Sequence, residues 1–330
     1  MEATCNAIRS HGVIPGLWFE FEVAGSCSTL WNRDDLLLHR DGVPVQAGSR
    51  RFLDMRKQEC HDYLESRVLN LIDRCGIGYV KIDYNETVGI GVDGAESPGE
   101  GLRQHILGVY RFLDRMKQRF PELVVENCSS GGQRMEISMI QRCAMTSFSD
   151  AHETVSIPVI AANLNHMTLP RLLQIWAVLR SGDTIQRLIY SLSATFLGRM
   201  CLSGNLSDLN KEQRQTVKKA VEFYRNVSDT IKNGRSIRFG PGVASYNNPK
   251  GWQAVVRYCT EDKQTALIVV HSFKDAPESI VIPVEKAFRI ANINIFALPE
   301  VTADISGSAI TISGITCFSG CVIKLSNATK

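Results

Sequence analysis

Short segments in which apolar and polar residues alternate are separated along this chain by longer segments with helical spacing. Residues 78–86, with the sequence GYVKIDYNE, show the alternating pattern. Side chains of a strand point to opposite faces in turn, so this segment would have an apolar face and a polar face, the polar one formed by Lys81, Asp83 and Asn85. The pattern predicts either a half-exposed edge strand or a strand end that brings charge to one place.

The order of the predicted elements indicates a parallel sheet. Strand patterns and helical patterns alternate over the first two thirds of the chain, and Gly76 and Pro121 stand where two of the helices should end. Alternation of this kind is typical of βαβ units. Strands are expected at 13–23, 78–86, 122–132, 144–153 and 200–204, and helices at 1–11, 53–74, 99–120, 133–143, 170–182, 184–198 and 209–231, the last capped by Ser207 or Asp208.

Polar residues follow several of the predicted strands at their carboxyl ends. In a (β/α)8 barrel these ends surround one shared pocket, whereas an open doubly wound sheet gathers its site at one switch point. No GxGxxG or GxxxxGK[ST] motif opens any of the helices, which argues against a nucleotide-binding sheet. We therefore predict a TIM barrel. The residues concerned are Glu20, Glu22, Lys81, Asp83, Asn85, Glu126, Asn127, Cys128, Ser149 and Asp150.

The pattern changes after about Pro241. Short β-rich runs separated by turn residues follow one another to the end of the chain, for example WQAVVRY, QTALIVVHSF and CVIKLS. Such spacing is typical of an antiparallel sandwich. The sequence therefore predicts two domains, a β/α barrel over 1–240 and a small antiparallel β-domain over 241–330.

Composition narrows the classes of function. The 330 residues carry 37 basic and 34 acidic side chains, and no basic run with interleaved aromatic residues suggests a nucleic-acid partner. No apolar stretch is long enough for a membrane helix, and the N-terminus lacks the pattern of a signal peptide. The ten cysteines are scattered without metal-ligand spacing, so we expect reduced thiols, a cytoplasmic location and no metal site.

Four motifs in the predicted barrel resemble glycoside hydrolase family 36, the family of retaining α-galactosidases. They are GLWFEFE at 16–22, KIDYNE at 81–86, ENCSSGGQR at 126–134 and SFSD at 147–150. The resemblance covers about Gly16 to Gly204 and continues weakly into the β-domain, and ENCSSGG is its most specific motif. It implies a barrel enzyme that cleaves terminal α-linked galactose from oligosaccharides or glycoconjugates.

By this resemblance Asp83 corresponds to the catalytic nucleophile and Asp150 to the general acid/base. A retaining glycosidase needs two such carboxyl groups about 5–5.5 Å apart. Lys81 is expected to favour the ionised form of Asp83, and Asp150 has no neighbouring cation in sequence, which permits the raised pKa that an acid needs. The mechanism requires neither a metal nor a redox cofactor.

The resemblance also implies a set of substrate-binding residues. Trp18 would be a core aromatic by ordinary burial preferences and Cys128 a buried thiol, but their places in the motifs put both at the sugar. Arg50 and Arg51 compete for the position of a substrate-binding arginine. His152 is not assigned to the site. The remaining predicted contacts are Lys81, Asn85, Ser130, Gly131 and Gly132.

Departures from the family pattern leave other functions open. Ile82 replaces a usual tryptophan, Tyr84 and Glu86 stand where methionine and arginine are commoner, and Ala151 replaces a usual asparagine. An α-N-acetylgalactosaminidase is therefore a rival interpretation. A raffinose synthase-like galactosyltransferase, which uses the same double displacement with a sugar acceptor, and an inactive carbohydrate-binding fragment are the others.

Family members carry an N-terminal β-sandwich and two earlier barrel strands, and neither precedes Met1 here. The sequence is therefore expected to be an N-terminally truncated barrel, a state that exposes a sheet edge. A second copy of the chain or a complementing N-terminal fragment would cover that edge. The expected partners are this second copy or fragment and an α-galactoside oligosaccharide, with no nucleic acid and no membrane.

Overall fold

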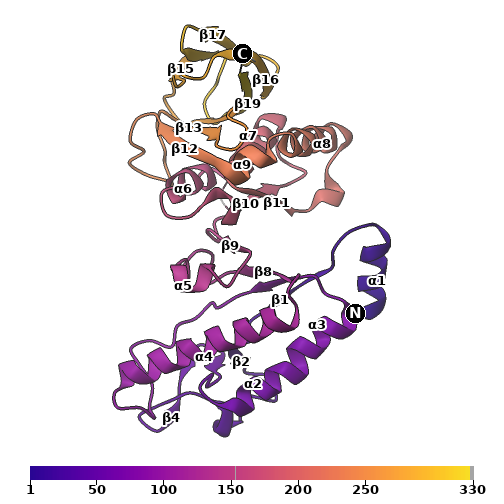
Figure 1. Ribbon diagram of the computed structural model, residues 1–330, viewed down its shortest axis with the longest axis vertical. Helices are drawn as coiled ribbons and strands as arrows, with labels where there is room; N and C mark the ends of the chain where they lie inside the picture. Colours follow the sequence, from indigo (N-terminus) through magenta and orange to yellow (C-terminus); the bar gives the residue numbers. More distant parts are fainter. Residues whose placement is uncertain (153, 328–330) are drawn as a thin grey trace. The chain divides into compact units, whose positions relative to one another are not determined.

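The computed structural model describes residues 1–152 and 154–327 (Figure 1). The chain forms two compact units, Met1–Ser147 and Phe148–Lys330. Within the described residues no helix is both long and apolar enough to span a membrane.

The first unit contains a parallel sheet with the strand order β1-β7-β8-β9. Trp18 lies opposite Lys81, and Lys81 in turn lies opposite Glu126 in the register of the sheet. The carboxyl ends of β1, β7 and β8 therefore lie next to one another, as the sequence predicts. The strands are β1 (Gly16–Phe19), β7 (Tyr79–Ile82), β8 (Val124–Asn127) and β9 (Met145–Ser147).

Helices cover this sheet and form its hydrophobic core. Helix α4 (Pro98–Arg119) begins at the Ser97 cap, whose hydroxyl accepts a hydrogen bond from the Glu100 N–H. Gly76 ends α3 in the left-handed conformation, with φ of 59°. Figure 1 shows α4 alongside the helical run at 58–75, and buried side chains of both pack on the strands. The other helical segments are α1 (Glu2–Ser10), α2 (Gln58–Leu64), a π-helical turn (Glu65–Leu69) and α3 (Asn70–Cys75).

Two small antiparallel sheets occupy the segment between β1 and α2. The strand predicted at 13–23 is shorter than expected, since β1 ends at Phe19, and β3 to β6 were not predicted. Strand β6 pairs with β2 on one side and with β5 on the other. The helix predicted at 133–143 is wrong, because only α5 (Ile137–Ile140) is helical there. The small strands are β2 (Val23–Gly25), β3 (His39–Arg40), β4 (Val43–Pro44), β5 (Gln46–Ala47) and β6 (Arg50–Phe52).

The second unit contains a parallel βαβ element. Strands β10 (Leu173–Leu179) and β11 (Arg199–Gly204) pair in parallel, and α7 (Ile185–Thr195) connects them. The helix predicted at 170–182 is wrong: a 3₁₀ turn at Pro170–Leu172 leads directly into β10. Nearly every residue of β10 is buried, and a short apolar run that is buried on both faces has the same pattern as a buried helix.

Three more helices belong to this unit. The long amphipathic pattern at 209–231 forms α8 and α9, which are separate helices. Neither Ser207 nor Asp208 caps α8. Asn210 does so in a capping box, since its side chain accepts the Gln213 N–H and the Gln213 side chain accepts the Asn210 N–H. The helices are α6 (Ile157–Leu164), α8 (Lys211–Arg225) and α9 (Ser228–Asn233).

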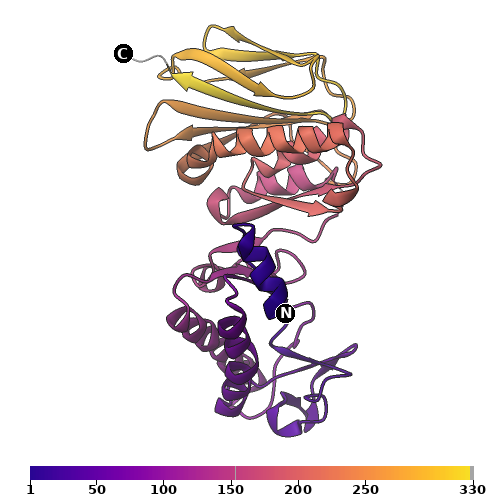
Figure 2. The same ribbon diagram turned by 90° about the vertical axis from the view of Figure 1, so that its right-hand side faces the viewer.

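Two antiparallel sheets complete the second unit (Figure 2). The larger has the order β12-β13-β14-β19-β16 and the smaller β15-β18-β17, and the apolar faces of both contribute to one core. The predicted runs are confirmed as strands, but β12 and β17 had not been predicted. The strands are β12 (Gly234–Phe239), β13 (Trp252–Cys259), β14 (Thr265–Ser272), β15 (Ser279–Pro283), β16 (Ile290–Phe296), β17 (Thr302–Ser306), β18 (Ala309–Ser313) and β19 (Gly320–Asn327).

The predicted domain division at 240/241 stays a prediction, although β12 already belongs to the antiparallel sheet before that position. The strand predicted at 144–153 is shorter than expected, since β9 ends at Ser147. Glu153 from that prediction, and residues 328–330 of the predicted β-domain, lie outside the described residues.

Candidate active site at the strand ends

Asp83 lies directly after β7 and is held by several hydrogen bonds. The Trp18 indole Nε1 donates to Asp83 Oδ2 over 3.1 Å, and the Tyr84 N–H donates to Oδ1 over 2.9 Å. Burial alone would raise the pKa of the Asp83 carboxyl. Hydrogen bonds from Cys128, Asn85 and Trp18 outweigh burial and hold that pKa below its ordinary value. Asp83 is therefore a carboxylate at neutral pH, as an attacking group must be.

Lys81 lies on the same face of the strand as Asp83, but it forms an ion pair with Glu126. Its ammonium Nζ lies 3.4 Å from Glu126 Oε1 and 3.2 Å from the Ser147 hydroxyl. Burial opposes the charged form of Lys81, yet the Glu126 charge and, to a smaller extent, the Asp83 charge raise its pKa above the ordinary value. Glu126 is itself buried and accepts a hydrogen bond from Tyr79. Lys81 thus brings a fixed positive charge to the row of strand ends.

Asn85 belongs to a second polar group centred on Glu20. The Asn85 amide donates to Glu20 Oε1 over 2.7 Å, while its oxygen accepts the Ser130 N–H over 3.2 Å. Arg50 donates to Glu20 Oε2 over 3.1 Å and lies 3.7 Å from Glu86 Oε1. Glu20, which follows β1, therefore connects this strand end with β6 and with the segment after β7. Glu20 was expected among the polar residues at the strand ends, but no role in the site was assigned to it.

The structure distinguishes the two competing arginines. Neighbouring residues of a strand point to opposite faces, and only Arg50 joins the Glu20 group. Arg51 donates instead to the Trp31 carbonyl over 2.8 Å, with its guanidinium 4.3 Å from the centre of the Trp31 ring. Arg50 is thus the better placed of the two.

The glycine-rich loop after β8 approaches Asp83 through Cys128. The backbone of Cys128 bonds to the Ile82 carbonyl over 2.8 Å, and burial raises the pKa of its thiol to about 11, so it stays protonated and donates to Asp83. Ser130 and Gly131 have positive φ values of 42° and 86°. Gly131 and Gly132 carry no side chain, so a ligand can approach the backbone of this loop closely.

Asp150, the predicted acid/base, belongs to the second unit and is exposed. Its carbonyl is 2.8 Å from the His152 Nδ1, and the His152 ring stands edge-on to Trp176 with 5.3 Å between ring centres. The Ala151 N–H donates to the Ser149 hydroxyl over 3.0 Å. These contacts order the segment around Asp150, and its role stays a prediction.

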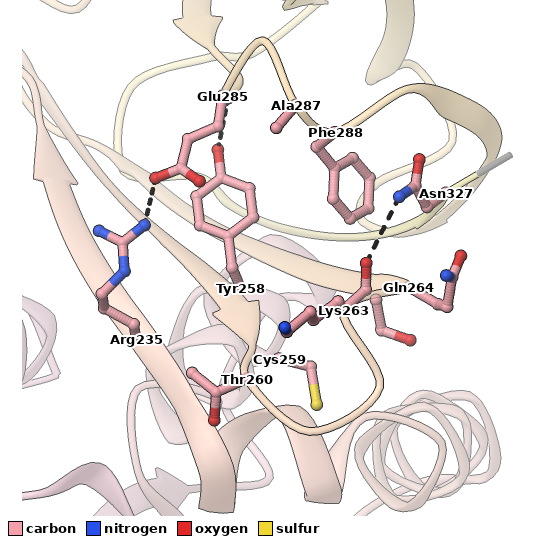
Figure 3. Close-up of a pocket in the computed structure, with 11 residues that line it drawn as sticks. Arg235, Tyr258, Cys259, Thr260, Lys263, Gln264, Glu285, Ala287, Phe288 and Asn327 are labelled. Carbon is pink, nitrogen blue, oxygen red and sulfur yellow. Dashed lines mark hydrogen bonds and ion pairs between the residues drawn. The ribbon is translucent and has the colours of Figure 1, made fainter.

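One cavity of the first unit borders a predicted site residue, and one cavity of the second unit does not. A cavity of about 280 Å³ in the first unit is bordered by Glu20 and Arg50. The cavity of about 410 Å³ shown in Figure 3 lies in the second unit, between Tyr258, Phe288 and the Arg235–Glu285 ion pair, and none of the predicted site residues lines it. Over 1–152 and 154–327 no group of three or more His, Cys, Asp and Glu side chains could hold a metal ion.

Comparison with known proteins identifies relatives. The family model described as Melibiase matches residues 1–234. The alpha-galactosidase AgaA of Geobacillus stearothermophilus is 25% identical over 290 residues, which are 81% of this chain and 37% of AgaA. The alpha-galactosidase Mel36A of Lactobacillus acidophilus is 24% identical over 274 residues, which are 80% of this chain and 36% of Mel36A.

Solved alpha-galactosidase structures also match this chain. The crystal structure of AgaA matches with a TM-score of 0.78 and 20% identity, covering 99% of this chain and 46% of that one. The alpha-galactosidase of Lactobacillus brevis matches with a TM-score of 0.80 and 20% identity, covering 100% and 46%. The predicted fold class, a β/α barrel followed by a small antiparallel β-domain, is confirmed. This chain spans less than half the length of these alpha-galactosidases.

Proposed function

Since the Melibiase model matches residues 1–234, this chain belongs to that family, and we propose that it forms catalytic machinery of a retaining α-galactosidase. The observation that carries the proposal is the Asp83 carboxylate, which receives hydrogen bonds from Trp18, Tyr84 and Cys128 and keeps a lowered pKa. A carboxylate held in this way at the end of a barrel strand can attack one defined atom of a bound sugar.

The proposed reaction is a double displacement. An oxygen of the Asp83 carboxylate forms a bond to the anomeric carbon while the bond to the leaving oxygen breaks, and Asp150 gives its proton to that oxygen. Water then attacks the anomeric carbon of the glycosyl-enzyme. Asp150 takes the proton of the water, and the Asp83 carboxylate leaves. Galactose is released with its original α configuration.

The proposed substrate is an α-linked galactosyl oligosaccharide. AgaA variants have been solved in complex with raffinose and with stachyose. In this chain the Trp18 side chain is 50% exposed, so its ring can stack on the apolar face of a sugar. Charged and amide groups beside it can bond to sugar hydroxyls. We propose Arg50, Lys81, Asn85, Cys128, Ser130, Gly131 and Gly132 for these contacts, with Arg51 placed away from them.

The proposed protein partner adds a strand beside β1. Among the described residues β1 pairs with β7 alone, so its other edge offers backbone N–H and C=O groups. A second copy of this chain or a separate fragment of the same family can supply a parallel strand there. Native mass spectrometry of the purified chain tests this, since a monomer with full α-galactosidase activity would contradict it.

We also propose a cytoplasmic location. All ten cysteines are free thiols, and several are buried in the two cores. Thiols persist in reducing compartments. Localisation of the tagged chain to an oxidising compartment would overturn this proposal.

Turnover of two aryl glycosides tests the function. The purified chain and Asp83→Ala are each given 4-nitrophenyl α-galactoside and 4-nitrophenyl α-N-acetylgalactosaminide. Hydrolysis of the galactoside that is lost in Asp83→Ala supports the proposal, whereas hydrolysis of the acetamido sugar alone assigns the rival specificity. Asp114→Ala, which removes a carboxylate paired with Arg142 away from the strand ends, is the control. A folded chain that hydrolyses neither substrate contradicts activity of this chain by itself.

A further inference from the structure

Tyr84, the residue after Asp83, is held at several points. Its N–H bonds to the Asp83 carboxylate over 2.9 Å, and its carbonyl accepts the Ser129 hydroxyl over 2.8 Å. Its own hydroxyl accepts the Val88 N–H over 3.2 Å, and its ring packs on Phe52 with 5.9 Å between centres. Burial raises the pKa of Tyr84 to about 12. A shift of the Tyr84 backbone would therefore displace a hydrogen-bond donor of the Asp83 carboxylate.

Arg134 lies over one face of the Tyr84 ring. Its guanidinium carbon lies 3.8 Å from the ring centre, a close cation–π contact. The same guanidinium forms two parallel hydrogen bonds to Glu22, of 2.6 and 2.8 Å. Glu22 is 2% exposed, so this two-point contact is sheltered from water and fixes the plane of the guanidinium.

The backbone of Arg134 is also attached to the strand ends. The Asn127 amide, at the end of β8, donates to the Arg134 carbonyl over 2.5 Å and to the Thr146 hydroxyl over 3.0 Å. Arg134 thus connects the segment after β1, through Glu22, with the ends of β7 and β8. These are the elements that carry Trp18, Asp83 and Cys128.

We propose that Arg134 is a positioning residue that holds the Tyr84 ring and thereby fixes the Asp83 carboxylate against the Trp18 indole. The proposal rests on the proposed function, in which Asp83 attacks the sugar. It explains why a buried ion pair is present here, since such a pair contributes little to net stability compared with apolar residues of similar size. A rigid, planar group over the ring limits movement in a way that a flexible apolar chain does not.

A cavity beside the ring adds to the argument. About 390 Å³ of space is bordered by Tyr84, Arg134, Tyr110 and His105. Removal of the guanidinium would extend this space to the face of the Tyr84 ring. The ring could then turn into it, and the hydrogen bond between the Tyr84 N–H and Asp83 would be disturbed.

The position of the Asp83 carboxylate can be followed in a ¹H–¹⁵N spectrum of the full chain. The indole N–H signal of Trp18 reports it, because this group donates to Asp83. Trp18→Phe assigns the signal among the four tryptophans. Asp83→Ala gives the displacement that follows loss of the acceptor. Arg134→Met is expected to move the signal by at least half of that displacement, and Arg134→Lys by less, since lysine keeps the charge beside Glu22 without the planar fork.

Arg142 provides a matched control. It also lies over a tyrosine ring, with 4.5 Å to the centre of Tyr110, and bonds a carboxylate, that of Asp114. Arg142→Met should leave the Trp18 signal in place. If Arg134→Met does not fold, Tyr84→Leu and Arg134→Lys test the same coupling.

A folded Arg134→Met or Tyr84→Leu whose Trp18 signal keeps the wild-type position overturns the proposal, as does an Asp83→Ala variant that leaves the signal unmoved. The spectrum requires no turnover, so absence of glycosidase activity would contradict the proposed function without deciding this one.

Discussion

The Trp18 indole donates a hydrogen bond to the Asp83 carboxylate, although the two residues are 65 positions apart in the chain. Parallel pairing of β1 with β7 sets Trp18 opposite Lys81, and Asp83 follows two residues later. The indole can therefore reach the carboxylate and still expose half of its surface. One aromatic residue is thus placed to stabilise the charge of the attacking group and to face a sugar.

Trp18→Phe should raise the pKa of Asp83, because the ring stays and the hydrogen bond is lost. A carboxyl whose pKa is lowered by folding stabilises the protein above its unfolded value of about 3.9 and loses that contribution as the pH falls through the folded pKa. In Trp18→Phe the contribution should be smaller, and its loss should be complete at a higher pH. The carboxyl ¹³C shift of Asp83, followed from pH 7 downward, measures the midpoint. Trp31→Phe is the control, and equal midpoints in Trp18→Phe and wild type would refute the prediction.

Gly108→Ala should destabilise the first unit despite the better helix propensity of alanine. A Cβ at Gly108 would lie 2.0 Å from the Met55 carbonyl oxygen, so α4 would have to move away from the segment that it packs on. Overpacking of this kind costs about 1–3 kcal/mol. Gly99 lies in the same helix, and a Cβ there would meet nothing within 4 Å, so Gly99→Ala should be neutral or stabilise by up to about 1 kcal/mol.

Urea unfolding of the two variants beside wild type measures both changes. Equal effects of Gly108→Ala and Gly99→Ala would show that the packing of α4 differs from the one described.

Arg257→Lys should destabilise the second unit. Arg257 is 1% exposed and donates to the carbonyls of Phe196 and Leu197, at the end of α7, over 3.2 and 3.0 Å. No carboxylate among residues 1–152 and 154–327 pairs with it, and burial lowers its pKa to about 10. Lysine cannot reach both carbonyls with the same geometry, so we expect a loss of about 3 kcal/mol in the free energy of unfolding.

The exposed Arg235 of the Arg235–Glu285 pair is the control for this change. Arg235→Lys should alter the free energy of unfolding by at most about 1 kcal/mol. Similar values for the two variants in urea unfolding would contradict the role of Arg257 at the end of α7.

Asn210→Ala should weaken α8 by about 1 kcal/mol, because it removes the cap from the Gln213 N–H. Ser207→Ala should have little effect, since the Ser207 hydroxyl bonds within its own turn to Asn205 and Asp208. Circular dichroism during thermal unfolding compares the two. A larger effect of Ser207→Ala would contradict the cap at Asn210 and support the one expected from the sequence.

Local signals in the sequence predicted much of the first unit. Gly76 ends α3 and Pro121 follows the end of α4, as predicted, and the alternation around Asp83 placed Lys81 and Asn85 on its face. Where burial is complete, the pattern fails: β10 has hardly any polar position, so its period could not be read.

The sequence also could not predict which charged side chains pair with one another. Glu22 and Arg134 are 112 positions apart, and only the fold brings them together. From the sequence, either Arg50 or Arg51 could be the substrate-binding arginine. The pairing of β6 with β2 shows which of the two faces the Glu20 group. Lys81 was predicted to act on Asp83, but the register of β7 with β8 gives it Glu126 as the nearer partner.

Azide rescue of Asp83→Ala tests most directly whether Asp83 is the attacking group. The variant is given 4-nitrophenyl α-galactoside with and without sodium azide, and the products are separated and identified by proton NMR. We predict that turnover is lost without azide and returns with it, as β-galactosyl azide, because the small anion enters the space left by the carboxylate. Hydrolysis by Asp83→Ala at the wild-type rate, with no azide product, would contradict the account.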